Sequence, residues 1–337
     1  MRDKVLQKLS EADDYISGQD LCEQLGVSRT AVWKAVNRLK EDGYDILSVP
    51  NKGYKLAGRS EVYSEYEIRS RLKTQALASE VVFYEQTGST NNDCKRLMQE
   101  AIANPERSIL VAAANQEGGK GRRGRAWTSP AGSSISFSLG LVPRTSLRSA
   151  SMLTLVMALA VVRAINEVTG LKAGIKWPND IVIDGRKVCG ILTEMNLEEG
   201  EIASLVIGVG INVSQTDFDE EIKDTATSLL LELQRSGEPS QEGSISRSAI
   251  TAECVNQFEK LYDTFCIRQD LSELKEEYEK VLVNKGRVVR VLDPKGEYEA
   301  TSLGITDDGE LMVKTGDGQI RNVYAGEVSV RGIYGYT

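Results

Sequence analysis

The sequence predicts a multidomain α+β protein, with an N-terminal winged helix-turn-helix, a central mixed α/β domain and a small C-terminal β-barrel. The chain has 337 residues, and one hydrophobic core usually serves about 100–200 residues. A polar stretch at Ala57–Glu67 separates a helical first segment from the rest, and after Gly286 short β-rich runs alternate with Gly and Asp. We therefore expect domains at residues 1–60, 61–283 and 284–337.

In the first domain, apolar residues at helical spacing predict helices around Val5–Leu9 and Leu21–Leu25. Ser28 is a good N-cap for a third helix, which Gly43 ends. A hairpin is expected over residues 44–56. Helix, helix-turn-helix and hairpin in this order describe a winged helix-turn-helix.

The third of these helices presents a polar and basic face opposite its apolar positions. Such side chains contact phosphates and base edges, and the helix N-terminus adds a positive dipole. The alternative is a solvated amphipathic helix in a partner-binding domain, but the turn, the basic face and the hairpin together favour DNA. The candidate DNA-binding residues are Ser28, Arg29, Thr30, Trp33, Lys34, Asn37, Arg38 and Lys52, with Lys55 beside them on the hairpin.

The central domain mixes the periodicities of strands and helices. Strands are expected at Val81–Tyr84, Ile109–Ala113, Ser134–Val142, Ile181–Asp184, Val188–Met195 and Ile202–Val213. Helices are expected at Asn91–Ala103, Ser149–Val168, Ser246–Arg268 and Leu271–Leu282. The runs VVRVL, YEATSLGI, LMVKT and IRNVY then predict a five-stranded barrel.

The composition is that of a soluble globular protein, and it restricts the possible chemistry. Hydrophobic residues make up 41% and charged residues 27% of the chain, which excludes wholesale disorder. There are no histidines, so histidine bases, nucleophile triads and imidazole metal sites are excluded. The five cysteines form no C-x-x-C pair, and neither zinc nor haem is expected. Any catalysis must rely on Lys, Arg, carboxylates, hydroxyls and backbone amides.

The N-terminus has no signal-peptide core. The longest uncharged helical stretch, Ser149–Val162, is shorter than the roughly 20 apolar residues that cross a bilayer. We therefore expect a cytoplasmic protein without a membrane partner. The net charge of −8 argues against a protein that coats nucleic acid, but residues 25–59 are locally basic.

A glycine- and cation-rich loop, Gly118–Trp127, follows a predicted strand. It is neither a P-loop nor a dinucleotide-binding fingerprint, since it lacks their spacings. Glycines let backbone amides approach a ligand, and Arg and Lys neutralise phosphates. Trp127 offers an aromatic face for a base. The alternative is a flexible basic loop that binds nucleic acid or serves as a linker.

Two further segments carry candidate chemistry. Lys176–Asp180 is followed by Arg186, Lys187 and Gly190, which places lysines near a carboxylate. Such a group can hold a substrate acid and offset charge at a phosphate, although an exposed hairpin has the same composition. Gly88–Asn92 brings short polar side chains to a strand-to-helix turn. They either cap that helix or line a small pocket that recognises neutral donors and acceptors.

In this order, the motifs resemble those of bacterial bifunctional biotin–protein ligases that double as repressors of the biotin operon. The similarity runs through nearly the whole chain. Its carrying segments are Ser89–Asn91, Gln116, Gly119–Arg125, Trp127, Lys176–Asp180, Arg186-Lys187, Gly190, Gly208–Asn212 and Ala325–Glu327. The resemblance implies a central domain similar to class II aminoacyl-tRNA synthetases and a C-terminal SH3-like barrel.

The resemblance also implies a two-step reaction. Biotin and ATP, with Mg²⁺, give biotinyl-5′-AMP and pyrophosphate, and a lysine of a biotin carrier domain, as in acetyl-CoA carboxylase, then attacks the mixed anhydride. Biotinyl-5′-AMP is expected to act as corepressor, to promote a homodimer and to place paired winged helices on operator DNA.

Residue roles follow from the same resemblance. Lys187, Arg122 and Asp180 are expected to be catalytic, with Asp180 also a Mg²⁺ ligand. Biotin is expected at Ser89, Thr90, Asn91, Gln116, Lys120, Gly121, Arg122, Lys187 and Gly190. ATP or the adenylate is expected at Arg122, Arg123, Arg125, Trp127, Lys176, Asn212 and Arg331. The familiar loop begins Gly-Arg-Gly-Arg, whereas here Lys120 keeps the charge but loses the bidentate fork.

Two other functions compete with this interpretation. One is a lipoate- or octanoate-attaching protein ligase, against which the Gly119–Arg125 loop and the first domain argue. The other is a catalytically silent, ligand-sensing transcription factor, against which Lys187, Asp180 and the arginine loop argue.

Overall fold

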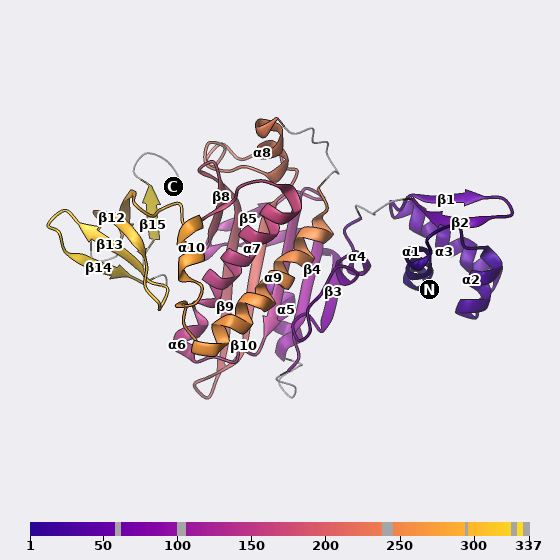
Figure 1. Cartoon of the computed structure of the whole chain (residues 1–337), viewed down its shortest axis with the longest axis horizontal. Coiled ribbons are helices and arrows are strands. Elements are labelled where there is room, and N and C mark those ends of the chain that lie inside the picture. Colours follow the sequence, from indigo (N-terminus) through magenta and orange to yellow (C-terminus); the bar gives the residue numbers. More distant parts are fainter. Residues whose placement is uncertain (58–61, 100–105, 238–244, 294–295, 325–328, 333–337) are drawn as a thin grey trace.

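A computed structural model of the chain describes residues 1–337 except 58–61, 100–105, 238–244, 294–295, 325–328 and 333–337. Figure 1 shows the small N-terminal domain at one end, a central sheet with helices and a C-terminal sheet at the other end. The predicted fold class is confirmed in all three parts. The domain boundaries at 60 and 283 stay a prediction.

The N-terminal domain consists of three helices and a two-stranded antiparallel hairpin. Ser28 caps the third helix, because its hydroxyl accepts a hydrogen bond from the amide of Ala31. Gly26 ends the second helix at a φ of 65°, a left-handed conformation that suits glycine. The elements are α1 (Arg2–Glu11), α2 (Gly18–Leu25), α3 (Arg29–Glu41), β1 (Ile46–Val49) and β2 (Gly53–Leu56).

A short segment that includes α4 (Glu65–Arg69) joins this domain to the centre. Towards the winged helix, the hydroxyls of Tyr44 and Ser64 lie 3.1 Å apart. Towards the centre, the hydroxyl of Tyr63 lies 3.1 Å from that of Thr251. Neighbouring residues of the segment therefore contact different domains.

The central sheet has eight strands, in the order β3-β4-β6-β10-β9-β8-β7, with β5 paired to β4. Strands β3 and β4 run parallel, and the other neighbours run antiparallel. The strands are β3 (Glu80–Thr87), β4 (Ile109–Lys120), β5 (Ala126–Ser129), β6 (Ser134–Leu141), β7 (Gly174–Lys176), β8 (Asp180–Ile183), β9 (Arg186–Glu198) and β10 (Glu201–Asn212).

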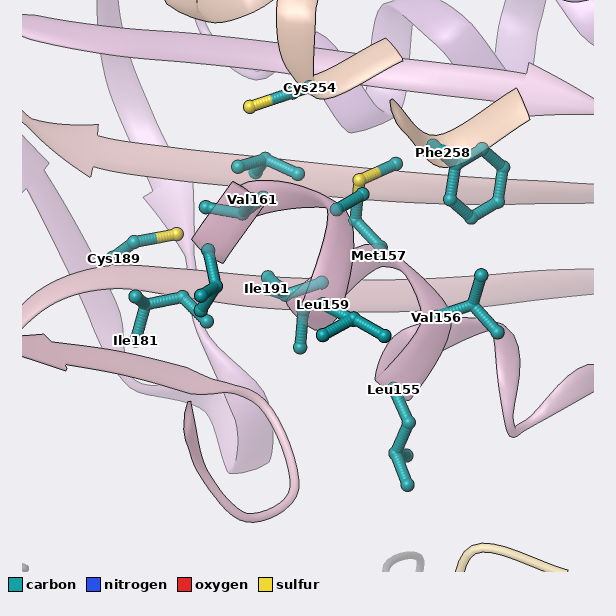
Figure 2. Packing of buried hydrophobic residues seen from close by; sticks show 14 of the residues in the cluster. Leu155, Val156, Met157, Leu159, Val161, Ile181, Cys189, Ile191, Cys254 and Phe258 are labelled. Atoms are coloured by element: carbon teal, nitrogen blue, oxygen red, sulfur yellow. The ribbon is translucent and has the colours of Figure 1, made fainter. Parts of the chain in front are cut away.

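Helices cover both faces of this sheet. Helix α7 (Leu153–Thr169) packs with α9 (Arg247–Arg268) on one face, and α5 (Thr90–Gln99) packs on the other. Figure 2 shows Met157 and Val161 of α7 among side chains of α9 and β9. The shorter helices are α6 (Leu147–Ala150), α8 (Leu229–Ser236) and α10 (Lys275–Val281).

The apolar stretch Leu147–Thr169 is long and hydrophobic enough to cross a membrane by length and composition alone. However, 78% of its most apolar window is buried inside the protein. A helix that is apolar on all sides is expected at the centre of a core. The stretch is therefore accounted for as a core segment of the central domain.

The C-terminal part forms an antiparallel five-stranded sheet in the order β14-β13-β12-β11-β15. It shares one hydrophobic cluster with the central domain. Trp177 anchors the two parts, since its indole Nε1 donates to the carbonyl of Gly309 at 3.0 Å. The strands are β11 (Val288–Leu292), β12 (Tyr298–Ile305), β13 (Leu311–Thr315), β14 (Ile320–Val323) and β15 (Ser329–Gly332).

Candidate active site

Residues of β4, β5, β9 and β10 line a cavity of about 1130 Å³. Every residue that the sequence predicts at biotin or the nucleotide lines it, with the exception of Arg331. Arg331 belongs to β15, but its side chain lies outside the described part of the structure, as does the whole Ala325–Glu327 motif. The separate motifs therefore meet in one place.

One end of the cavity is neutral and polar. The Gln116 side-chain oxygen accepts hydrogen bonds from the Thr90 amide at 2.9 Å and from the Thr90 hydroxyl at 3.1 Å. The Ser138 hydroxyl of β6 lies 2.8 Å from the Thr90 hydroxyl. Thr90 thus faces Gln116 and β6. Of the two alternatives for Gly88–Asn92, this geometry supports a small polar pocket.

Asn91 extends this network to β9. Its amide oxygen accepts from the Ser138 hydroxyl at 2.6 Å, and its amide nitrogen donates to Glu194 at 2.7 Å. A Cβ atom on Gly208 would lie only 2.0 Å from the same amide oxygen, so this position requires glycine. Asn91 is fixed on both sides.

Glu194 also pairs with Lys95 of α5. Burial acts to raise the pKa of Glu194, but hydrogen bonds from Lys95 and Asn91 outweigh it and leave the pKa below its ordinary value. Glu194 is therefore ionised at neutral pH and accepts hydrogen bonds, which orients the Asn91 amide.

The glycine–arginine loop connects β4 to β5. The amide of Gly121 donates to the carbonyl of Arg125 at 2.7 Å, which closes the loop. Arg123 has a φ of 59° and Gly124 a φ of 73°, both in the left-handed region. Lys120, Arg123 and Arg125 are exposed, and all three line the cavity.

Arg122 lies deeper than the other cations of this loop. Its guanidinium donates to the side-chain oxygen of Asn179 at 3.1 Å. Burial is the largest influence on its pKa, which lies below the ordinary value, and the neighbouring Arg123 and Arg125 act in the same direction while Asp180 opposes them. An arginine stays charged at neutral pH even so. Its position joins the loop to the Lys176–Asp180 motif.

One face of the Trp127 ring packs against two glycines of the sheet. Gly190 of β9 and Gly210 of β10 are directly opposite each other in the sheet. A Cβ on Gly210 would come within 2.6 Å of the indole ring, and one on Gly190 within 3.1 Å. Within the described residues, the buried indole Nε1 has no hydrogen-bond acceptor. The ring thus has one covered face and an unused donor.

Lys187 and Asp180 form the charged centre of the cavity. The Lys187 ammonium lies 2.5 Å from the Asp180 carboxylate and 5.6 Å from the centre of the Trp127 ring. Lys176 is buried, at 5% exposure, in the same cavity wall. Positive groups from β7, β9 and the loop therefore converge on one part of the cavity wall.

The other end of the cavity is closed by the segment that follows β10. Asn212 is 5% exposed, and its side-chain nitrogen donates to the carbonyl of Thr227 at 3.0 Å. Residues 215–226 contribute further lining, including several exposed acidic side chains. Within the described residues, no group of three or more Cys, Asp or Glu side chains is placed to hold a metal ion.

The predicted DNA-binding residues lie together on α3 and on the hairpin. Trp33 is 55% exposed, and Lys34 and Thr30 are exposed beside it. Arg29 donates to Gln19 of α2, and Arg38 pairs with Glu41 at 3.3 Å. Asn37 is half-buried and Lys52 is exposed at the hairpin tip. The face exists as expected, and its role stays a prediction.

Sequence reasoning missed several residues that shape the site. Ser138 and Glu194 hold the side chains of Thr90 and Asn91 in the neutral pocket. Their signal was weak, because each is a single polar residue whose partner lies far away in the chain. Gly208 and Gly210, by contrast, belong to the Gly208–Asn212 motif that the sequence does reveal, and alternate glycines in a strand often mark a close approach to one face.

Three family models match successive parts of the chain. They are described as HTH domain, over residues 2–55, as Biotin/lipoate A/B protein ligase family, over residues 83–212, and as Biotin protein ligase C terminal domain, over residues 286–331. A solved biotin protein ligase from Aquifex aeolicus, in complex with biotin and ATP, is 28% identical with a TM-score of 0.61. The match covers 75% of this chain and 99% of that one.

Curated relatives match almost from end to end. The Bifunctional ligase/repressor BirA of Bacillus subtilis (strain 168) is 37% identical over 333 residues, which is 98% of each chain. The protein of the same name from Escherichia coli (strain K12) is 28% identical over 318 residues, or 94% of each chain. This chain therefore belongs to the family of bifunctional ligase/repressor BirA proteins.

Proposed function

We propose that this protein is an ATP-dependent biotin–protein ligase that also represses transcription with biotinyl-5′-AMP as corepressor. The observation that carries the proposal is the meeting of a neutral hydrogen-bonding pocket and a cluster of cations in one cavity. Family membership supports both activities. The reaction joins biotin to a lysine of a biotin carrier domain and converts ATP to AMP and pyrophosphate.

Biotin's ureido ring is neutral and carries both donors and acceptors, which suits the end of the cavity formed by Thr90, Asn91 and Gln116. Ser89 lines the same end. The biotin carboxylate then extends past Gly190 towards Lys187. Lys120 and Gly121, at the start of the loop, complete the proposed biotin site.

ATP occupies the opposite end in this proposal. Asn212 offers an amide to the adenine, and Trp127 offers an aromatic ring. Arg123, Arg125 and Lys176 face the phosphates. Arg331 is a further proposed nucleotide contact, and only the family resemblance supports it.

In the first step, a carboxylate oxygen of biotin attacks the α-phosphorus of ATP, and the bond to pyrophosphate breaks. Two anions approach each other, so the cavity must offset charge. Lys187 and Arg122 do this at the reacting carboxylate and α-phosphate, while Asp180 holds the Lys187 ammonium in place. Ordering of the loop at 119–125 around the adenylate would exclude water.

In the second step, the amine of the carrier lysine attacks the acyl carbon, and the bond to AMP breaks as the amine loses a proton. The nucleophile belongs to the partner protein, and AMP is a good leaving group. The lack of histidine in this chain therefore does not impede the reaction.

We propose that Mg²⁺ accompanies ATP, with Asp180 as the protein carboxylate nearest the phosphates. Mg²⁺ is commonly held by one or two carboxylates and the phosphates of its substrate, and Asp180 lines the cavity together with Asp217, Asp219 and Glu221. The ion would neutralise phosphate charge during pyrophosphate departure.

For repression, we propose that the adenylate promotes a homodimer whose paired α3 helices contact operator DNA. The two winged helices of a dimer contact two half-sites. The dimer therefore binds DNA more tightly than one weakly charged domain does alone. Carrier protein and DNA are both cytoplasmic partners, and the five cysteines, all free, suit that compartment. No membrane partner is proposed.

A panel of three acids tests the ligase activity. The protein is incubated with ATP, Mg²⁺ and biotin, lipoate or octanoate, and pyrophosphate release and acyl-AMP are measured. We expect biotin to be favoured by a factor on the order of 10⁴, because the pocket would leave buried polar groups unpaired around an acid without the ureido ring. A reaction without acid measures background ATP hydrolysis.

Comparable turnover of lipoate or octanoate would show a ligase of the alternative class. Absence of pyrophosphate with every acid, together with ligand-dependent DNA binding, would instead indicate a silent sensor.

A further inference from the structure

The segment Thr225–Thr227 connects the two halves of the cavity. The amide of Lys187 donates to the carbonyl of Thr225 at 2.7 Å, and the amide of Thr227 donates to the carbonyl of Lys187 at 2.8 Å. The carbonyl of Thr227 accepts from the Asn212 side chain at 3.0 Å. One short segment therefore holds the backbone of Lys187 and the side chain of Asn212.

This segment is fastened by a buried carboxylate outside the cavity. Glu232 of α8 is 2% exposed, and it does not line the cavity. It accepts a hydrogen bond from the Thr227 hydroxyl. Both of its oxygens accept from Arg186, each at 3.1 Å, in a bidentate pair, and Arg235 contacts one of them. Arg186 directly precedes Lys187.

The ionised side chain of Glu232 is suited to holding Arg186 and Thr227 in place. Burial acts to raise its pKa, but hydrogen bonds from Arg186 and Thr227 and the charges of both arginines hold the pKa below its ordinary value. A buried carboxylate with all of these donors is expensive to disturb, because removal of its charge leaves the buried Thr227 hydroxyl and the partly buried Arg186 guanidinium poorly paired. Arg186 and Thr227 thus have one shared anchor.

We propose that Glu232 is a positioning residue for adenylation. It fixes Thr227 and Arg186, and so keeps Lys187 and Asn212 at the spacing that ATP requires. The inference rests on the proposed function of the cavity. It assigns to α8 a role in nucleotide binding, although none of the residues of this helix lines the cavity.

A purely structural anchor would lower stability without changing substrate affinity, so the test separates the two. Glu232→Gln keeps the shape of the side chain and removes its charge. Thr227→Val removes only the hydroxyl and leaves the carboxylate–arginine pairs intact, and Thr227→Ser restores the hydroxyl. Glu67→Gln is the matched control, because Glu67 is also buried, at 4% exposure, and pairs with Arg71 away from the cavity.

We measure thermal stability, steady-state kinetics for biotin and ATP, and the affinity for each substrate by calorimetry. Glu232→Gln and Thr227→Val are expected to weaken ATP binding and raise its KM about tenfold, as loss of an orienting partner commonly does. Biotin affinity is expected to fall less than ATP affinity, because the Thr90–Gln116 pocket is untouched and only the Lys187 end of the biotin site is displaced. Thr227→Ser recovers ATP binding. A double variant that carries both Glu232→Gln and Thr227→Val is expected to bind ATP no more weakly than either single variant.

The inference fails if Glu232→Gln and Glu67→Gln both lower the melting temperature while ATP affinity and KM equal those of wild type. It also fails if Thr227→Val binds ATP normally. Failure of the proposed function is distinguishable, because wild-type protein would then release no pyrophosphate from biotin and ATP. In that case the ATP affinities still decide whether Glu232 positions the cavity.

Discussion

Replacing Lys187 by glutamine is expected to lower the rate of biotinyl-5′-AMP formation by about 100-fold or more, the size of effect seen when one donor to a developing charge is removed. The ammonium is the group beside Asp180 and the Trp127 ring. The substitution removes charge stabilisation at the reacting centre and leaves Asp180 without this partner. Single-turnover formation of the adenylate from biotin and ATP measures the effect.

Lys172→Gln is the control, since Lys172 is exposed and does not line the cavity. It makes the same charge change and should form the adenylate at the wild-type rate. A Lys187→Gln protein that is folded and retains more than about a third of the wild-type rate would remove Lys187 from the reaction centre.

The second large effect concerns DNA. Reversal of charge at Lys34 on the exposed face of α3 is expected to cost roughly 1–3 kcal/mol of DNA-binding free energy per half-site. Operator DNA is first selected from a randomised library by wild-type protein with biotinyl-5′-AMP. Binding of wild type and Lys34→Glu is then compared with and without the adenylate, alongside the fraction of dimer.

Lys4→Glu, on the exposed surface of α1, gives the same net charge and should bind DNA as wild type does. Wild type should bind more tightly and dimerise more when the adenylate is present. Equal affinity with and without the adenylate would refute the corepressor role, and equal binding by Lys34→Glu would refute the assignment of the α3 face.

Much of the fold follows from local pattern. The all-round apolar stretch of α7 predicts a buried helix, and Ser28 with Gly43 bounds α3 well. Strand β4 is longer than the predicted Ile109–Ala113 and continues to Lys120. Its second half is glycine-rich and takes its strand conformation from pairing with β5, a partner that local propensity does not reveal.

The short elements α4, β5, β7 and α8 were not predicted. Strand β7, for example, has three residues, too few for a periodic pattern. It is defined by pairing with β8 on one edge. Tertiary contacts stabilise such elements, so a local pattern cannot identify them.

The candidate site shows the same division. Motifs whose residues are adjacent in the chain, such as Lys176–Asp180, could be predicted to line the cavity, and they do. Glu194 and Glu232 could not, because their function lies in partners far away, at Asn91 and at Arg186. Single carboxylates with long-range partners leave no spacing to recognise.

Labelling of a carrier protein tests the account most directly. Wild-type protein is incubated with biotin, ATP, Mg²⁺ and the biotin carrier domain of an acetyl-CoA carboxylase, and the intact mass of the carrier is followed together with AMP. We predict that the carrier gains one biotinyl group on its lysine for each AMP released, and that Lys187→Gln protein gives far slower labelling. An unlabelled carrier in the presence of active, folded wild-type protein would contradict the account.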